Sequence, residues 1–169
     1  KQFLYMKVKC EMEELELGDG SSAKDLAEKM NQREPHQALA AMINGEICDL
    51  DSPLKDGDDV HLVDFNSPEG KEVFWHTSAH VLAHAVLRLW PDAEPTIGPP
   101  IEKGFYYDFA NLEVSEEDFG KIEKEIKKIL GEGLKPERHL FKGKKEAIAE
   151  FGKNPFKKEL IEGFEEGSP

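Results

Sequence analysis

The stretch AAMING, at residues 40–45, decides the fold of the first part of the chain. Its four leading apolar residues form a short run of the kind found in buried strands. Asn44-Gly45 follows directly and is the strongest two-residue signal for a β-hairpin. We therefore predict a strand at 40–43 and a tight turn at 44–45.

The segments on either side of this hairpin complete a small domain. Gln2 to Lys9 alternates in polarity and predicts a strand, and 11–17 predicts a second one after a turn. Residues 18–22 form a loop that ends in a serine suited to cap a helix at about Ala23–Asn31. A turn at 55–59 leads to a last strand, so the region is typical of a small α+β roll. The buried candidates of the first strand are Leu4, Met6, Val8 and Cys10.

Composition narrows the class of protein. The formal net charge is −13 and the mean hydropathy −0.58, which argues against a protein that simply coats nucleic acid but allows a local basic patch. No apolar run reaches the roughly 20 residues that span a bilayer, and Lys1 to Cys10 does not resemble a signal peptide. We expect a cytoplasmic protein in which Cys10 and Cys48 are buried, reduced thiols.

A composition break divides the chain. Pro68 and Gly70 stand between two periodic regions, which predicts a linker at 66–70 between a domain at 1–65 and another at 71–169.

The second domain opens with a helix that carries histidines. Apolar residues recur at three- and four-residue steps from His76 until Pro91 stops the helix. His76 and His80 are one turn apart and lie on nearly the same face, while His84 turns away from them.

Three interpretations of this histidine pair remain open. The rings can be packed or exposed without function, can bind a metal, or can act as acid and base on one water. Zinc would need a third ligand, and the glutamate of a metalloprotease HExxH motif is replaced by Thr77. We therefore expect no metal at His76 and His80.

Segments with aromatic and basic residues follow the histidine helix. Gly98-Pro99-Pro100 forces a turn, and 104–109 predicts an aromatic strand, most simply packed in a sheet. Ser115 begins a helix that ends at Gly131 or Gly133. The four lysines of that helix suggest either a solvated face of ion pairs or a phosphate contact. Beyond it we predict a strand at 138–141, a helix at 144–151, and a turn with a strand at 154–161.

The first domain resembles the TGS module, a β-grasp fold found in threonyl-tRNA synthetases, some GTPases and guanosine-tetraphosphate synthetases. The resemblance lies in Ile43-Asn44-Gly45, Asp49-Leu50, Leu54 and Asp56–Val60. The resemblance implies an accessory module that faces RNA or has a regulatory role and that catalyses no reaction itself. The chain has no GxxxxGK[ST] phosphate loop, which counts against the GTPases.

The second domain is similar to the editing domain of bacterial-type threonyl-tRNA synthetases. The motifs that carry the similarity, in order and spacing, are FWHTSAHVL at 74–82, IGPP at 97–100 and GFYYD at 104–108. The resemblance implies an α/β sandwich-type domain, incomplete at its C-terminal end, with His76 and His80 as catalytic residues. It implies that substrate or tRNA is bound by Lys157, Tyr107, Asp108 and Gly98.

The sequence departs from the family pattern in two ways. Phe156 stands before Lys157 where many members have tyrosine, and Lys158 adjoins it, so the functional lysine can be displaced by one position. A later cysteine and histidine cluster is absent, as are the regions expected to bind ATP, Mg and Zn. We expect the front part of a longer protein that is a homodimer as a whole, whereas this part can be monomeric.

The resemblance implies that the whole enzyme joins threonine to tRNA(Thr) with ATP, and that this region binds the acceptor arm and hydrolyses mischarged Ser-tRNA(Thr). By itself this region is expected to hydrolyse little, because one wall of the pocket is missing. The alternatives are a non-catalytic RNA-binding module and a freestanding deacylase.

Overall fold

The chain divides into two compact units, Lys1–Trp75 and His76–Pro169, in a computed structural model. The structure describes residues 5–30, 37–134, 137 and 139–165. The predicted positions of Leu4 and Asn31 lie outside the described residues.

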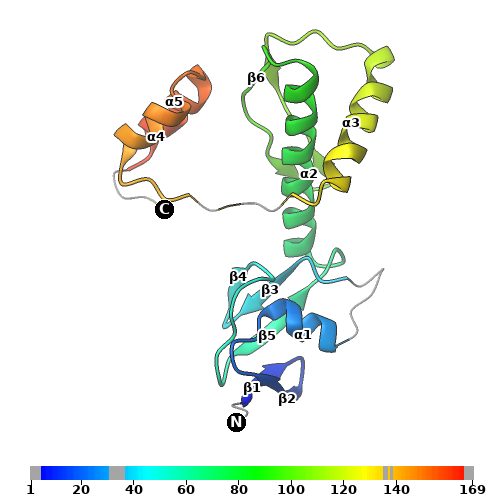
Figure 1. Ribbon diagram of the computed structural model, residues 1–169, viewed down its shortest axis with the longest axis vertical. Coiled ribbons are helices and arrows are strands. Elements are labelled where there is room, and N and C mark those ends of the chain that lie inside the picture. The colour runs from blue at the N-terminus through cyan, green and yellow to red at the C-terminus, as the bar shows by residue number, and fades with distance from the viewer. Residues whose placement is uncertain (1–4, 31–36, 135–136, 138, 166–169) are drawn as a thin grey trace. The chain divides into compact units, whose positions relative to one another are not determined.

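The first unit is built on a five-stranded sheet with helix α1 (Ala23–Lys29) (Figure 1). The strand order is β2-β1-β5-β3-β4, in which β1 and β5 are parallel and the other neighbours antiparallel. The strands are β1 (Tyr5–Cys10), β2 (Glu13–Gly18), β3 (Ala40–Ile43), β4 (Glu46–Cys48) and β5 (Asp59–Val63). The predicted α+β roll is confirmed.

The core of this unit lies between the sheet and α1. Val8 and Leu26 are fully buried in it, as the alternation of β1 and the apolar stripe of α1 predicted. Ser22 caps α1 as expected, since its hydroxyl accepts a hydrogen bond from the backbone N–H of Asp25. Of the two free cysteines Cys10 is buried, whereas Cys48 is half-buried.

The predicted β3–β4 hairpin forms at Asn44-Gly45, where both residues have positive φ, of 53° and 88°. The Asn44 side chain also joins distant segments. Its Nδ2 donates to Oδ1 of the buried Asp58 at 2.8 Å, and its Oδ1 accepts from the N–H of Asp59 at 3.0 Å. Asp58 Oδ2 accepts from the N–H of Lys55 at 2.7 Å, so one carboxylate fastens the turn at 55–59 to the hairpin.

We expect Asp58→Ala to lower the free energy of unfolding of the first unit by about 2 kcal/mol, because it leaves buried donors without an acceptor. Hydrogen exchange of the β3 and β5 amides measures the change. Asp56→Ala on the same turn is the control, since Asp56 is exposed and accepts the N–H of Lys7. Equal protection in the two variants would contradict the role of Asp58.

Helix α2 (Pro68–Leu89) begins earlier than the sequence predicted. Pro68, Glu69 and Gly70, assigned to the 66–70 linker, are helical. Proline fits the first turn of a helix because the N–H that it lacks has no partner there. Gly70 fits because a Cβ at this position would lie 1.7 Å from the carbonyl oxygen of Asp64. The boundaries of the functional domains stay a prediction.

Aromatic rings join the start of α2 to the end of the sheet. The ring of Phe65, which follows β5, lies 5.0 Å from that of Phe74 and 5.6 Å from that of Trp75, both edge to face. The first two turns of α2 therefore pack within the first unit.

The second unit contains the rest of α2, two short two-stranded sheets and four further helical segments (Figure 1). The strands are β6 (Glu94–Pro95), β7 (Pro100–Ile101), β8 (Gly104–Phe105) and β9 (Phe109–Ala110), with β6 paired to β9 and β7 to β8. The helices are the 3-10 turn η1 (Glu116–Asp118), α3 (Phe119–Gly131), α4 (Lys144–Phe151) and α5 (Pro155–Gly163). The predicted helices at 115–131 and 144–151 are confirmed.

Three predictions in this unit are wrong. The expected strand at 154–161 is helix α5, and the aromatic strand at 104–109 is divided into β8 and β9. Residues 139–141 do not form a strand, and Arg138 lies outside the described residues. No helix within the described ranges is both long enough and apolar enough to cross a bilayer.

Candidate active site

Helix α2 brings His76 and His80 together. Their Nε2 atoms lie 2.9 Å apart and their ring centroids 4.6 Å apart, with the ring planes at 69°. Both side chains are exposed, as expected for residues one helical turn apart on the polar side of the helix. The predicted pair is therefore adjacent and open to solvent.

The contact between the two rings constrains their protons. At 2.9 Å the two Nε2 atoms are within hydrogen-bond distance, so one must donate and the other accept. A neutral pair therefore has one Nε2–H and one Nε2 lone pair on the same face of α2. This combination suits a site that orients one water and takes a proton from it.

The pKa of His80 is lowered from its usual value of 6.5. Burial of part of the ring is the largest cause, followed by the neighbouring His76 and by the positive charge of Lys157. All three favour the neutral imidazole. His80 thus remains an unprotonated base at neutral pH.

We expect Lys157→Gln to raise the pKa of His80, because removal of a nearby positive charge makes the imidazolium less unfavourable. NMR titration of the imidazole protons measures the shift. Lys158→Gln removes the same charge from the neighbouring position and is the control, because Lys158 is not among the groups that perturb His80. A larger upward shift in the Lys158 variant would show that the functional lysine is Lys158.

Helix α5 positions Lys157. Asn154 caps the helix by accepting the N–H of Lys157 at 3.0 Å, and Pro155 follows as the first helical residue. The Nδ2 of Asn154 also donates to the carbonyl oxygen of Pro95 at 3.0 Å, which ties α5 to β6. The Nζ of Lys157 lies 4.8 Å from the ring centre of Phe151, within the range of a cation–π contact.

Gly98 supports Tyr107 and has no room for a side chain. A Cβ at Gly98 would lie 2.2 Å from Cδ2 of Tyr107, and the Tyr107 ring also stacks on Phe109 with 4.8 Å between the ring centroids. Burial raises the pKa of Tyr107. The ring lines a groove of about 450 Å³ between α2 and α3, whose other walls include Leu82 and Ile122.

Asp108 lines a different cavity from Tyr107. The cavity that Asp108 lines is a cleft of about 750 Å³. The other lining residues are Thr96, Ile97, Phe156, Glu159, Leu160, Gly163 and Phe164. The backbone around Asp108 is fixed, since Thr96 donates to its carbonyl oxygen from the hydroxyl at 2.9 Å and from the N–H at 3.0 Å. Helix α5 thus lines the Asp108 cleft and also carries the Lys157 charge that acts on His80.

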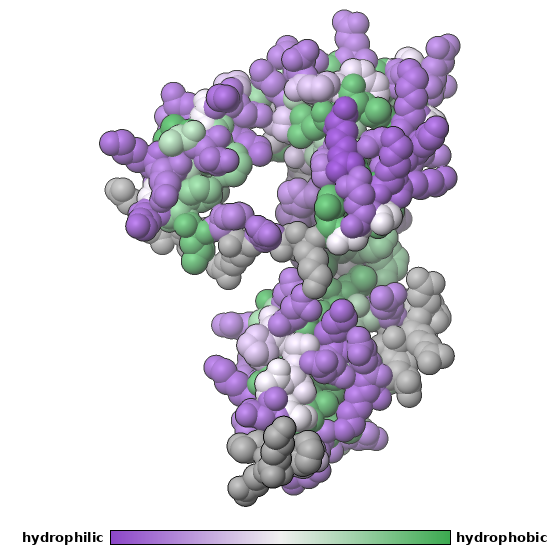
Figure 2. All heavy atoms as spheres, in the orientation of Figure 1, coloured by the Kyte–Doolittle hydropathy of each residue, from purple (hydrophilic) through white to green (hydrophobic). Residues whose placement is uncertain are grey.

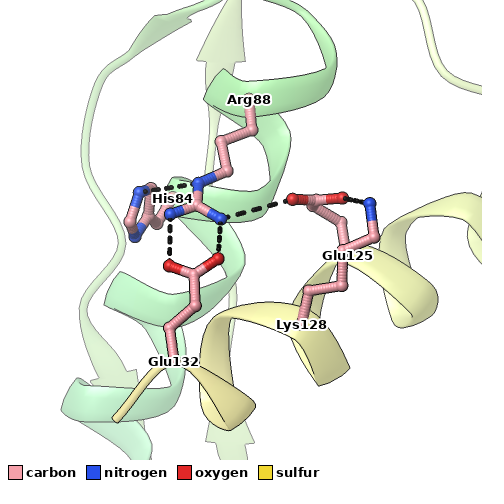
Figure 3. Close-up of polar contacts among 5 residues, drawn as sticks. All are labelled: His84, Arg88, Glu125, Lys128 and Glu132. Atoms are coloured by element: carbon pink, nitrogen blue, oxygen red, sulfur yellow. Dashed lines mark hydrogen bonds and ion pairs between the residues drawn. The ribbon is translucent and has the colours of Figure 1, made fainter. Parts of the chain in front are cut away.

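His84 belongs to another cluster, as its position on the helix predicted. Its Nε2 accepts from Nε of Arg88 at 3.1 Å (Figure 3). Arg88 also binds Glu132 through both terminal nitrogens, at 2.6 and 2.7 Å, and Glu125 at 3.4 Å. These bonds connect α2 to the C-terminal end of α3 and lower the pKa of Glu132. Sequence reasoning missed this cluster because Arg88 and Glu132 are 44 residues apart.

In the described part of the chain, no three side chains of His, Cys, Asp or Glu gather in a way that could hold a metal ion. The His76–His80 pair therefore lacks a third protein ligand among these residues.

Known proteins share both parts of this sequence. The model of the TGS domain family matches residues 8–64. A threonine--tRNA ligase from Protochlamydia amoebophila is 56% identical over 165 residues, which is 98% of this chain and 25% of that protein. Proteins of the same name from Chlamydia trachomatis (serovar L2b) and Rubrobacter xylanophilus are 53% and 41% identical over 91% and 88% of the chain, and 24% and 23% of their own lengths.

The chain spans about a quarter of the length of these curated relatives. The TGS match agrees with the strand order and the helix of the first unit, and the similarity to the ligases continues through the histidine helix and the α4–α5 region. The chain therefore contains a TGS domain and belongs to the threonine--tRNA ligase family, as the counterpart of the N-terminal quarter of those proteins.

Proposed function

We propose that this chain forms the hydrolytic proofreading part of a threonine--tRNA ligase, where it binds the acceptor end of tRNA(Thr) and removes serine attached by mistake. The observation that carries the proposal is the solvent-accessible His76–His80 pair, with 2.9 Å between the Nε2 atoms. The family relationship supports tRNA(Thr) as the partner of the whole protein.

The two amino acids explain why such an enzyme needs a second site. Serine differs from threonine by one methyl group, which gives a binding pocket only about 1–3 kcal/mol of discrimination. A separate hydrolytic step that accepts the smaller product adds the missing selectivity.

In the proposed reaction, water attacks the carbonyl carbon of the seryl ester. The water would replace the direct contact between the rings, donating to one Nε2 and accepting from the Nε2–H of the other. His80 is the proposed base because its lowered pKa keeps the ring unprotonated, and so able to accept a proton, at neutral pH. The water proton passes to the imidazole, the ester C–O bond breaks, and the ribose hydroxyl of the tRNA leaves with that proton. Serine and uncharged tRNA are the products.

The other predicted residues have supporting roles in this proposal. Lys157 would hold the 3′ end of the tRNA through a phosphate or the terminal adenosine. Asp108 would orient the aminoacyl group from the neighbouring cleft, while Gly98 and Tyr107 would shape the wall behind it. The attachment of threonine with ATP, together with the Mg and Zn that it implies, would belong to parts of the relatives that this chain does not cover.

The experiment uses a chimera in which this chain replaces the matching quarter of the P. amoebophila ligase, because one wall of the hydrolytic site is expected outside this chain. Preformed Ser-tRNA(Thr) is supplied and its loss is followed in single turnovers. Clearance that depends on His76 and His80 supports the proposal. Clearance that is unchanged in both alanine variants, with tRNA affinity retained, would instead indicate a non-catalytic RNA-binding module.

A further inference from the structure

Positive charge is concentrated in the segment 142–158, which comprises α4, the following turn and the start of α5. The whole chain has a formal charge of −13, yet this segment has only two acidic residues, Glu146 and Glu150. Its six lysines, which we call the lysine patch, are Lys142, Lys144, Lys145, Lys153, Lys157 and Lys158. In Figure 2 hydrophilic side chains project from the α4–α5 hairpin around its hydrophobic ones.

Helix α3 provides a comparison within the same unit. It has four lysines, but six carboxylates stand between Glu116 and Glu132. Lys121 pairs with Asp118 and Lys128 with Glu125, at 2.8 and 2.7 Å. The α3 lysines thus lie on a face of mixed charge, which favours the solvated ion-pair interpretation over a phosphate contact.

The lysine patch lacks such compensation. Among the described residues, Lys158 alone of the six has its Nζ within 4.0 Å of a carboxylate oxygen, which is Oε1 of Glu162 at 3.8 Å. Lys145 and Lys153 are exposed and have no acidic partner in the described part of the chain. Uncompensated ammonium groups on a folded surface produce a local positive potential even when the net charge is strongly negative.

Hydrogen bonds fix the two helices that carry the lysine patch. The Nζ of Lys144 donates to the carbonyl oxygen of Glu162 at 3.0 Å and so links α4 to the end of α5. The Asn154 bond to Pro95 fixes the turn between these helices to β6. Lys157 extends the patch to the surroundings of His80, whose pKa it lowers.

We propose that the lysine patch binds the phosphodiester backbone of the tRNA acceptor arm next to the histidine pair. This inference rests on the proposed function and identifies the surface that would hold its substrate. Lysine is a point charge that suits the phosphate backbone, whereas the acidic remainder of the chain repels RNA and would orient it toward the patch.

The test is equilibrium binding of the whole 169-residue chain to fluorescently labelled tRNA(Thr) transcript between 50 and 200 mM salt. Each lysine that contacts a phosphate adds about 0.7–0.9 to the slope of log affinity against log salt. The double variant Lys145→Gln/Lys153→Gln should therefore reduce that slope by about 1.5. Lys124→Gln/Lys127→Gln on α3 removes the same charge from exposed lysines and should leave the slope unchanged.

An unchanged slope in the α4–α5 variant, or an equal reduction in the α3 variant, would overturn the patch as the binding surface. Failure of the proposed function is visible separately. His80→Ala should leave the salt slope unchanged and lower the single-turnover rate of the chimera, whereas the α4–α5 double variant should reduce the salt slope and raise the protein concentration at which that rate is half-maximal. Loss of hydrolysis without loss of slope thus concerns the histidines alone, and the reverse concerns the patch alone.

Discussion

Replacing His80 with alanine is expected to slow the hydrolysis of Ser-tRNA(Thr) by about 100- to 10,000-fold, the usual contribution of a general base. Alanine removes the nitrogen that would take the proton from water. His76 cannot replace it, because a single imidazole no longer provides both the donor and the acceptor that orient the water. The same order of loss is expected for His76→Ala.

The measurement is the single-turnover rate in the chimera with the P. amoebophila ligase. His84→Ala is the matched control, because it changes the same residue type one turn further along α2, where His84 contacts Arg88 and not the pair. Threonine attachment by the same chimeras shows whether the protein is folded. Normal clearance of Ser-tRNA(Thr) by the His76 and His80 variants would contradict the assignment, as would an equal loss in His84→Ala.

Replacing Gly70 with alanine is expected to lower the free energy of unfolding of the first unit by about 3 kcal/mol. The added Cβ would lie 1.7 Å from the carbonyl oxygen and 2.5 Å from the carbonyl carbon of Asp64, and this backbone cannot move without displacing the start of α2. The N–H of Gly70 also donates to Oγ of Ser67 at 3.0 Å, a bond that the same shift would break.

Hydrogen exchange of the β1 and β5 amides reports this change within the first unit. Gly18→Ala is the control in the same unit, since its Cβ would meet only Oγ of Ser21 at an ordinary 3.8 Å and should change stability by less than about 0.5 kcal/mol. Full protection in Gly70→Ala would mean that α2 does not pack on Asp64 as described.

Much of the fold could be predicted because its signals are local. Asn44-Gly45 predicts a turn, Ser22 a helix cap and the pattern at 144–151 a helix, each from residues within the element itself. The spacing of His76 and His80 placed both rings on one side of α2, since the helix pitch alone determines it. Family motifs supplied the residues whose roles are proposed.

The failures have physical causes. Asn154-Pro155 is typical of a turn. However, asparagine is also a good N-cap and proline a good first helical residue, and here the pair begins α5. Pro68 likewise suits both a linker and the first turn of a helix, and here it begins α2. Tyr107 and Asp108 adjoin in the sequence yet line different cavities, which no local pattern encodes. The Arg88–Glu132 contact depends on how α2 and α3 pack, which no local pattern encodes.

The aromatic packing at the start of α2 has a practical consequence for isolating the TGS domain. The match to the TGS family model ends at residue 64, whereas the packing of Phe65 against Phe74 and Trp75 lies beyond it. A gene fragment that stops at residue 64 would lack all three rings and also the first two turns of α2, whose Gly70 lies against the carbonyl group of Asp64. A stand-alone TGS domain that keeps this packing therefore extends to Trp75 and includes the first two turns of α2.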